Sequence, residues 1–282
     1  MLPFGIQRAS WQLMLVTVPL ASLASLVGLL EPATYRDAAW LVPQSRGQDL
    51  VTLLAMLALA PLLLAMRRRG SARATLAALG IEGYVLYTYV GAAFEYAFNQ
   101  LFLLYVVLFA TSTFALASAL RTLDVAQLAS TFNERAPRRS VAGFLFGLAA
   151  MLGLLWLGQL VPALLTQRVP ESIARSNGGL RFVFALDLGI IAPLSALGAR
   201  WLLQRKPWGY VLAAIVTIKA ATMGLALLSM TAFSVAAGQP TQLGLAVVWI
   251  VLAVSGSVMA GWLLLASTEV SSGGHHTSLG KS

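Results

Sequence analysis

The 282-residue chain contains no cysteine, and its two histidines, His275 and His276, lie close to its C-terminal end. Without cysteine there can be no disulfide, thiolate metal site or cysteine nucleophile. Without histidine in the body of the chain, the sequence also lacks the HExxH zinc motif, a Ser–His catalytic pair and a histidine ligand for haem. The sequence predicts no strand, so it has no glycine-rich phosphate loop of the kind that follows a strand. We therefore expect no metal or cofactor, and the sequence favours a role other than catalysis.

Charged residues are also scarce: they make up 10% of the chain, whereas hydrophobic residues make up 59%. A soluble domain carries about 25% charged residues, so this chain could not cover a surface that faces water. The net charge of +9 does not indicate a nucleic-acid partner, because the arginines lie at the ends of apolar runs rather than on one face. The partner that the composition predicts is the lipid bilayer.

Eight apolar runs are separated by short polar segments. A helix of about 20 residues crosses the roughly 30 Å hydrocarbon core of a bilayer, and each run is near that length. We predict an all-α membrane protein, an eight-transmembrane-helix bundle that forms one domain over residues 1–267. The first run is longer than the core of a signal peptide and is interpreted as a retained helix. The Ser/Gly-rich segment 268–282 is predicted to be a disordered cytoplasmic tail. The runs cover residues 11–30, 49–66, 73–92, 101–120, 141–165, 181–203, 208–231 and 243–267.

Basic residues are distributed unevenly between the loops on the two sides of the predicted bundle. Eleven lie in the loops after the second, fourth and sixth runs, and five lie in the loops after the first and fifth. Cytoplasmic loops carry the excess of Lys and Arg, so we place the chain in the inner (cytoplasmic) membrane of the cell with both termini in the cytoplasm. The eleven are Arg67, Arg68, Arg69, Arg73, Arg121, Arg135, Arg138, Arg139, Arg200, Arg205 and Lys206.

Some residues recur 138 positions apart, which two parallel four-helix repeats over residues 1–130 and 140–267 would produce. The alternative is coincidence, because outer loops favour Pro and inner helix ends favour Arg in any such bundle. The matches are Pro32 with Pro170, Asp49 with Asp187 and Arg67 with Arg205.

Lys219 is the most informative polar residue, because it lies about 12 residues, or roughly 18 Å of helix, past Pro207 and so near the middle of the membrane. A Lys at this depth costs at least about 2.5–3.5 kcal/mol, so it should face the bundle interior and have a partner. Glu82 is the predicted partner, because the 138-residue offset aligns it with Ala220. The alternative is an ion pair that only locks two helices together.

Other polar residues are predicted to share a cavity with this pair. Asp187 lies inside the sixth run, nearer the outer surface than Lys219 by about 6–9 Å of helical rise. Tyr84 and Tyr87 could share a helix face with Glu82. The aromatic residues that follow, from Phe94 to Tyr105, could also line the cavity, or they could form an aromatic belt at the membrane interface. The predicted ligand-binding residues are Glu82, Tyr84, Tyr87, Glu95, Asn99, Asp187 and Lys219.

Two further features concern helix packing. Pro193 predicts a kink in the sixth helix. Ser255, Gly256, Ser257 and Gly261 form a small-residue surface in the eighth run, which could pack inside the bundle or form the seam of a homo-oligomer. We favour internal packing.

Three stretches carry a family resemblance: TYRDAAWLVPQSRGQDLVTL, GYVLYTYVGAAFEYAFNQLFLLYV and LDLGIIAPLSALGARWLLQRKPWGYVLA. They resemble a group of uncharacterised bacterial multi-pass membrane proteins over most of residues 33–230. The resemblance implies a membrane protein and no particular activity.

Together these patterns predict a protein that carries or senses a small solute or ion through an intramembrane polar cavity around Glu82, Asp187 and Lys219. The alternative is a non-transporting structural or assembly protein whose buried charges only fix helix packing. A membrane enzyme acting on a lipid is a third class, and no catalytic set supports it. Convergence of the three charges on one water-accessible cavity favours transport, whereas a dry, closed pair favours architecture.

Overall fold

The computed structural model describes residues 2–176, 180–239, 241 and 243–268, and over these residues it is built from helices. Eight of the described helices are long and apolar enough to cross a membrane, which confirms the predicted fold class. The predicted tail beyond Thr268, with His275 and His276, lies outside the described residues. Seven spans are α1 (Arg8–Leu30), α2 (Val42–Arg69), α3 (Ala72–Phe94), α4 (Phe102–Thr122), α6 (Arg138–Leu165), α10 (Pro207–Ala236) and α11 (Leu243–Leu265).

The remaining span, Arg181–Leu203, is interrupted. It consists of α8 (Arg181–Leu186), a π-helical turn η3 (Asp187–Ile191) and α9 (Ala192–Leu203). A short helix, η1 (Pro3–Gly5), precedes the first span, and three more occur in the connections: η2 (Pro32–Thr34), α5 (Val125–Ser130) and α7 (Glu171–Arg175).

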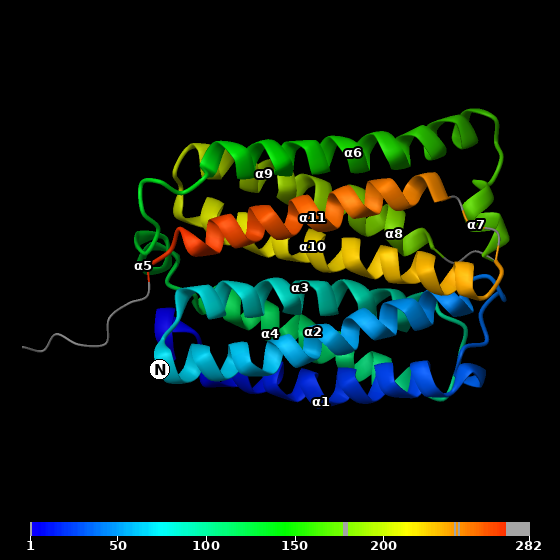
Figure 1. Cartoon of the computed structure of the whole chain (residues 1–282), viewed down its shortest axis with the longest axis horizontal. Coiled ribbons are helices and arrows are strands. Elements are labelled where there is room, and N and C mark those ends of the chain that lie inside the picture. The colour runs from blue at the N-terminus through cyan, green and yellow to red at the C-terminus, as the bar shows by residue number, and fades with distance from the viewer. Residues whose placement is uncertain (1, 177–179, 240, 242, 269–282) are drawn as a thin grey trace, which may run out of the picture.

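The first four spans lie on one side of the bundle and the last four on the other (Figure 1). Helix α10 joins the two groups, because it packs against α2 and α3 of the first group and against α9 and α11 of the second. Its small residues permit this: a side chain on Gly209 or Gly224 would collide with the backbone of a neighbouring helix. Small residues allow helices in a membrane to approach closely, where lipid provides no hydrophobic force to drive them together. This grouping is compatible with two four-helix repeats, and the duplication itself stays a prediction.

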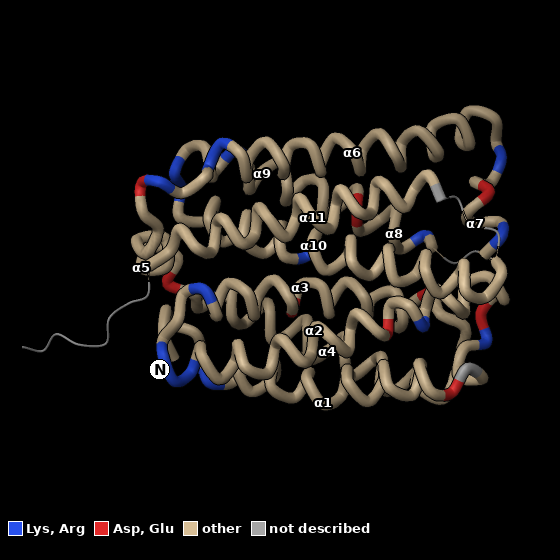
Figure 2. Tube along the Cα trace, in the orientation of Figure 1, with Lys and Arg blue, Asp and Glu red and all other residues tan. Residues whose placement is uncertain are grey.

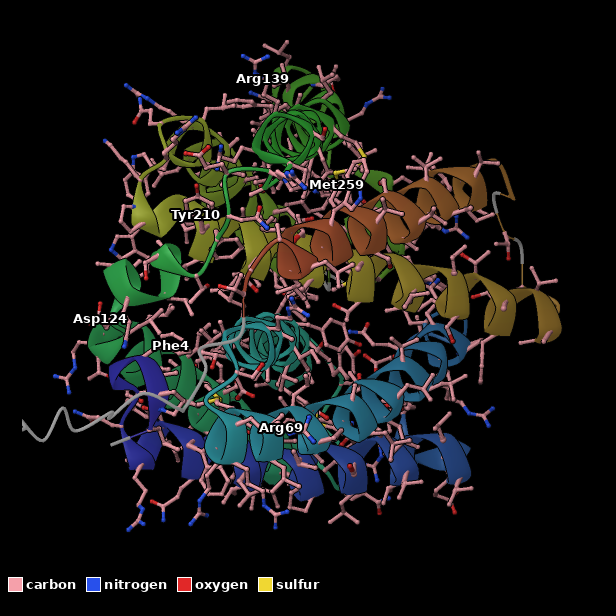
Figure 3. The ribbon with its side chains drawn as sticks, turned by 60° about the vertical axis from the view of Figure 1, so that its left-hand side comes forward. Phe4, Arg69, Asp124, Arg139, Tyr210 and Met259 are labelled. Carbon is pink, nitrogen blue, oxygen red and sulfur yellow. The ribbon has the colours of Figure 1, made fainter. Side chains whose placement is uncertain are left out.

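Both ends of the described chain lie at the same end of the bundle. The backbone N–H of Asp124 donates to the carbonyl of Phe4 at 2.7 Å, and these two residues lie beside each other in Figure 3. The N–H of Thr268 donates to the carbonyl of Thr131 at 2.8 Å, so the end of α11 reaches the same loops. Lys and Arg predominate at this end, although Asp and Glu also occur there, whereas the two signs are more evenly mixed at the opposite end (Figure 2). The basic loops that follow the second, fourth and sixth spans therefore lie at one end of the bundle, as predicted from the distribution of basic residues between the loops.

The small-residue surface of α11 divides into two parts. A side chain on Gly256 would lie within 2.9 Å of the Ala221 backbone of α10, so this glycine packs inside the bundle. Nothing lies within 4 Å of the position that a side chain on Gly261 would take. Internal packing is therefore correct for Gly256, and Gly261 takes no part in it.

Candidate functional site

Lys219 lies near the middle of α10 and is buried, with 7% of its surface exposed. Its Nζ lies 3.9 Å from Oδ1 of Asp187, which is itself 5% exposed. The difference in depth expected for the two residues does not keep them apart, because a Lys side chain reaches about 6 Å along its helix, roughly four residues of helical rise. The buried ion pair of the bundle is therefore Lys219–Asp187.

The predicted pairing of Lys219 with Glu82 is wrong. Glu82 is fully buried on α3, and its Oε1 accepts a hydrogen bond from the Thr17 hydroxyl of α1 at 3.2 Å. Residue Gly80, two positions earlier on the same helix, contacts Ile218 of α10. Successive helical residues point in different directions, so α3 presents Gly80 to α10 and Glu82 to α1. Glu82 and Lys219 were predicted to lie at similar depths, but Glu82 lies on the face of α3 that is turned away from α10, so the two charges do not meet.

Asp187 owes its position to the interrupted helix. Pro193 has no N–H, so it cannot bond to the carbonyl of Gly189, and its ring would clash there in a regular α-helix. The chain widens to a π-helical turn in which the N–H of Ala192 donates to the carbonyl of Asp187, five residues back. The predicted kink at Pro193 thus takes the form of a π turn, a local geometry that is frequent at functional sites.

Two aromatic residues hold the Asp187 carboxylate. The Tyr87 hydroxyl of α3 donates to Oδ1 at 3.1 Å, and the Trp156 indole N–H of α6 donates to Oδ2 at 2.9 Å. The Tyr87 ring also lies beneath the ammonium group, with Nζ of Lys219 3.8 Å from the ring centroid. An aromatic face attracts a cation, so this ring stabilises the lysine while its hydroxyl orients the aspartate. Four elements, α3, α6, η3 and α10, therefore converge on the pair.

A cavity of about 220 Å³ extends from the loops at the less basic end of the bundle down to Lys219 and Asp187. At its mouth it is lined by Asp37, which precedes α2, and by Ser176 and Leu180, which precede α8. Burial raises the pKa of the Asp37 carboxyl, and the hydrogen bond from the Ala97 N–H opposes this effect. The cavity thus links a mouth outside the spans to a charge pair inside them.

The cavity has two kinds of wall. The wall on the side of α2 and α3 is polar and includes Gln44, Gln48 and Thr88. The opposite wall is apolar, with residues from α6, α10 and α11. These are Leu148, Met151, Leu152, Leu155, Met223, Leu227, Met230, Trp249 and Leu252. Ligand pockets are mostly apolar with a few placed polar groups, which is the composition seen here.

Four of the predicted ligand-binding residues line this cavity: Lys219, Asp187, Tyr87 and Glu95. Glu95 lies near the mouth, where its Oε1 is 3.8 Å from Nε of Arg181. Their role in binding a ligand stays a prediction.

The other three predicted residues lie elsewhere. The Tyr84 hydroxyl is hydrogen-bonded to that of Thr52 at 2.9 Å inside the first helix group. The Asn99 side chain accepts from the N–H of Leu101 at 2.9 Å and so holds the loop before α4. Tyr84, Asn99 and Glu82 are absent from the described cavity lining.

Asp49 is the first residue of the second predicted run, and the structure extends that helix toward the N-terminus. Helix α2 begins at Val42 rather than at residue 49, so Asp49 lies well inside it. Its Oδ2 accepts a hydrogen bond from the Tyr35 hydroxyl. This pair joins the loop between α1 and α2 to α2, and neither residue is among the described cavity-lining residues.

Sequence reasoning missed Trp156, the second hydrogen-bond donor to Asp187. A single Trp inside an apolar run is typical of core packing, so its identity gave no signal. Gln48 and Thr88, which are hydrogen-bonded to each other at 2.9 Å, were also missed. Their polarity inside apolar helices was the available signal.

Replacing Glu82 by Gln should change the free energy of unfolding by no more than about 1–2 kcal/mol. Among the described residues no cation lies within 4.0 Å of Glu82, so no ion pair is lost, and Gln keeps an acceptor for Thr17. Denaturation of the purified protein in mixed micelles measures the effect. A loss of 3 kcal/mol or more, the size expected for a broken buried ion pair, would contradict this assignment.

No protein-family model, curated protein or solved structure matches this chain. Its function must therefore be argued from the geometry of the cavity.

Proposed function

We propose that this protein is a membrane carrier for a small organic solute, which enters from the less basic end and reaches the Lys219–Asp187 pair. One observation carries the proposal: a cavity that begins among loop residues stops at a buried ion pair within the spans. A charged residue inside the membrane is costly, and such residues mark solute and ion pathways in transporters. A solute site near mid-membrane, next to an interrupted helix, is also common in carriers.

The cavity does not continue between α9 and α10 toward the basic end, as expected of a carrier open to one side. On the basic side of the ion pair, α9 and α10 meet through Ala199, Leu202, Val211 and Ala214, each with no exposed surface. No residue of this layer lines the described cavity. Alternating access requires such a half-open state, in which the site communicates with one side only.

The distribution of basic residues supports an orientation for the carrier. The arginine-rich end is cytoplasmic by the positive-inside rule, so the cavity mouth faces the outside of the inner membrane. Both ends of the described chain lie at the arginine-rich end, which agrees with cytoplasmic termini. The carrier therefore takes its solute from the external face in this state.

A purely architectural pair is the competing explanation, and the cavity disfavours it. A pair that only fixes two helices needs close packing around it, because voids weaken the dispersion contacts of their lining. Here the pair borders about 220 Å³ of empty space. Space of this size is unexpected for a packing contact and expected for a binding site.

Accessibility of single cysteines tests the cavity, and the chain has no native cysteine to remove. Met223→Cys, which lines the cavity, should react with a membrane-impermeant methanethiosulfonate added to the outside of intact cells. Leu225→Cys is the matched control, because Leu225 is two residues away on α10 and 48% exposed on the outer surface of the bundle. A lipid-facing thiol stays unionised and unreactive. Equal protection of both cysteines would contradict the open cavity.

Uptake into proteoliposomes tests the carrier itself. Labelled small organic acids, amines and neutral solutes should reveal one class that the wild type accumulates and Lys219→Met does not. Lys206→Met is the control, because Lys206 begins the same helix but is exposed. Accumulation that is equal in wild type and Lys219→Met, or absent for every class while the cysteine result holds, would contradict a carrier built on this pair.

A further inference from the structure

The two members of the ion pair differ in how far their hydrogen-bonding capacity is used. Both oxygens of Asp187 accept hydrogen bonds, one from Tyr87 and one from Trp156. The Lys219 ammonium makes an ion pair at 3.9 Å and lies over the Tyr87 ring, and no hydrogen bond to it is formed by the described residues. An ammonium has three N–H donors, and buried donors are normally satisfied. The group at the base of the cavity that has no hydrogen-bond partner among the described residues is therefore a donor.

From this we infer that the solute is a small monocarboxylic acid with an apolar body, whose carboxylate binds the Lys219 ammonium. The inference rests on the proposed function and names its substrate class. A carboxylate supplies acceptor oxygens to a cation and forms strong, charge-assisted hydrogen bonds. An amine would bring a second positive charge beside the Lys219 ammonium, and the two like charges would repel each other.

The charges along the cavity limit the solute to one negative charge. Lys219 is the one cation among the described lining residues. Asp37 lines the outer part and repels a second negative charge on the solute there, whereas the charge of Glu95 is balanced by Arg181 at 3.8 Å. A dicarboxylate would leave one group without a cation inside the membrane, which is costly.

The apolar wall and the volume of the cavity limit the polarity and size of the rest of the solute molecule. Leucine and methionine side chains of α6 and α10 surround the space next to the ion pair. A cavity of roughly 150 Å³ holds one benzene ring. The 220 Å³ available here would accept a ring of that size together with a carboxyl group. Aromatic acids with one ring and short branched aliphatic acids fit this description.

Benzoate, benzamide and benzylamine form a matched series with one ring and an acidic, neutral or basic head group. We expect benzoate to bind the purified full-length protein in nanodiscs at least tenfold more tightly than the other two, by calorimetry, and to raise its Tm. Lys219→Met should lose at least tenfold in benzoate affinity, and Lys206→Met should retain it. Tighter binding of benzylamine or benzamide, no benzoate binding, or unchanged affinity in Lys219→Met would overturn the inference.

Asp187→Asn provides a second arm that does not depend on the stability of the Lys219 variant. The substitution removes the carboxylate that competes with the solute for the ammonium. Benzoate should therefore raise the Tm of Asp187→Asn more than that of the wild type, since ligand binding to the native state stabilises it. An equal or smaller rise would overturn the inference. The cysteine test uses no benzoate, so failure of the acid class and failure of the cavity are distinguishable.

Discussion

Replacing Asp187 by Asn will lower the free energy of unfolding by about 3–5 kcal/mol, the cost of leaving one member of a buried ion pair without its partner. Lys219 would then keep the Tyr87 ring as its remaining contact for the positive charge. Asn has nearly the same shape as Asp, and its carbonyl oxygen can still accept from one of the two donors, Tyr87 or Trp156. The loss therefore comes from charge and hydrogen bonding rather than from packing. Denaturation in mixed detergent micelles measures the change.

The double variant Asp187→Asn/Lys219→Met distinguishes the cost of an unpaired buried charge from other effects of the substitution on stability. Removing both charges leaves no unpaired ion, so most of the lost stability should return, as it does when buried pairs are replaced by apolar residues. Lys206→Met is the matched control for the lysine and should shift stability by less than about 0.5 kcal/mol, because the residue is exposed. If the double variant were as unstable as Asp187→Asn, the contact between the two groups would not be the source of the effect.

Replacing Gly224 by Val will destabilise the bundle by about 3 kcal/mol or prevent its assembly, because overpacking a tight contact forces the backbone to move. A Cβ at Gly224 would lie 2.6 Å from the backbone nitrogen and 2.7 Å from Cα of Ala253 in α11. Helix α11 must then separate from α10. The adjacent residue Leu252 lines the cavity, so solute binding should weaken together with stability.

Gly261→Val in α11 is the control for this prediction. Nothing lies within 4 Å of the Cβ that it would add, so the same change in side chain meets open space. Its Tm should stay close to that of the wild type, while that of Gly224→Val falls. Equal thermal unfolding of the two variants would show that the α10–α11 contact does not limit the stability of the bundle.

The polar site shows how much could be read from one chain. The length of the apolar runs and the cost of a mid-membrane lysine were enough to predict that Lys219 is buried with an acidic partner. Choosing that partner by depth alone selected Glu82, and the choice was wrong. Depth follows from position along a helix, whereas contact also requires the correct rotation about the helix axis, and α3 turns Glu82 toward Thr17.

Asp187 could be recognised as a candidate but not as the partner. Its placement depends on the π turn before Pro193, which changes the rotation of every residue that precedes it. A proline in an apolar run predicts some distortion, but a kink, a break and a widened turn are equally compatible with it. The role of Trp156 was not visible, because a Trp that packs and a Trp that donates to a carboxylate have the same sequence context.

By itself the sequence determined the eight helices, the grouping of basic residues at one end and the burial of Lys219, because these follow from the cost of placing polar groups in hydrocarbon. Only the tertiary structure decided which acid meets the lysine and which side chains line the cavity. These features depend on the rotation of each helix about its own axis and on the distance between neighbouring helices. Side-chain packing between the helices determines both.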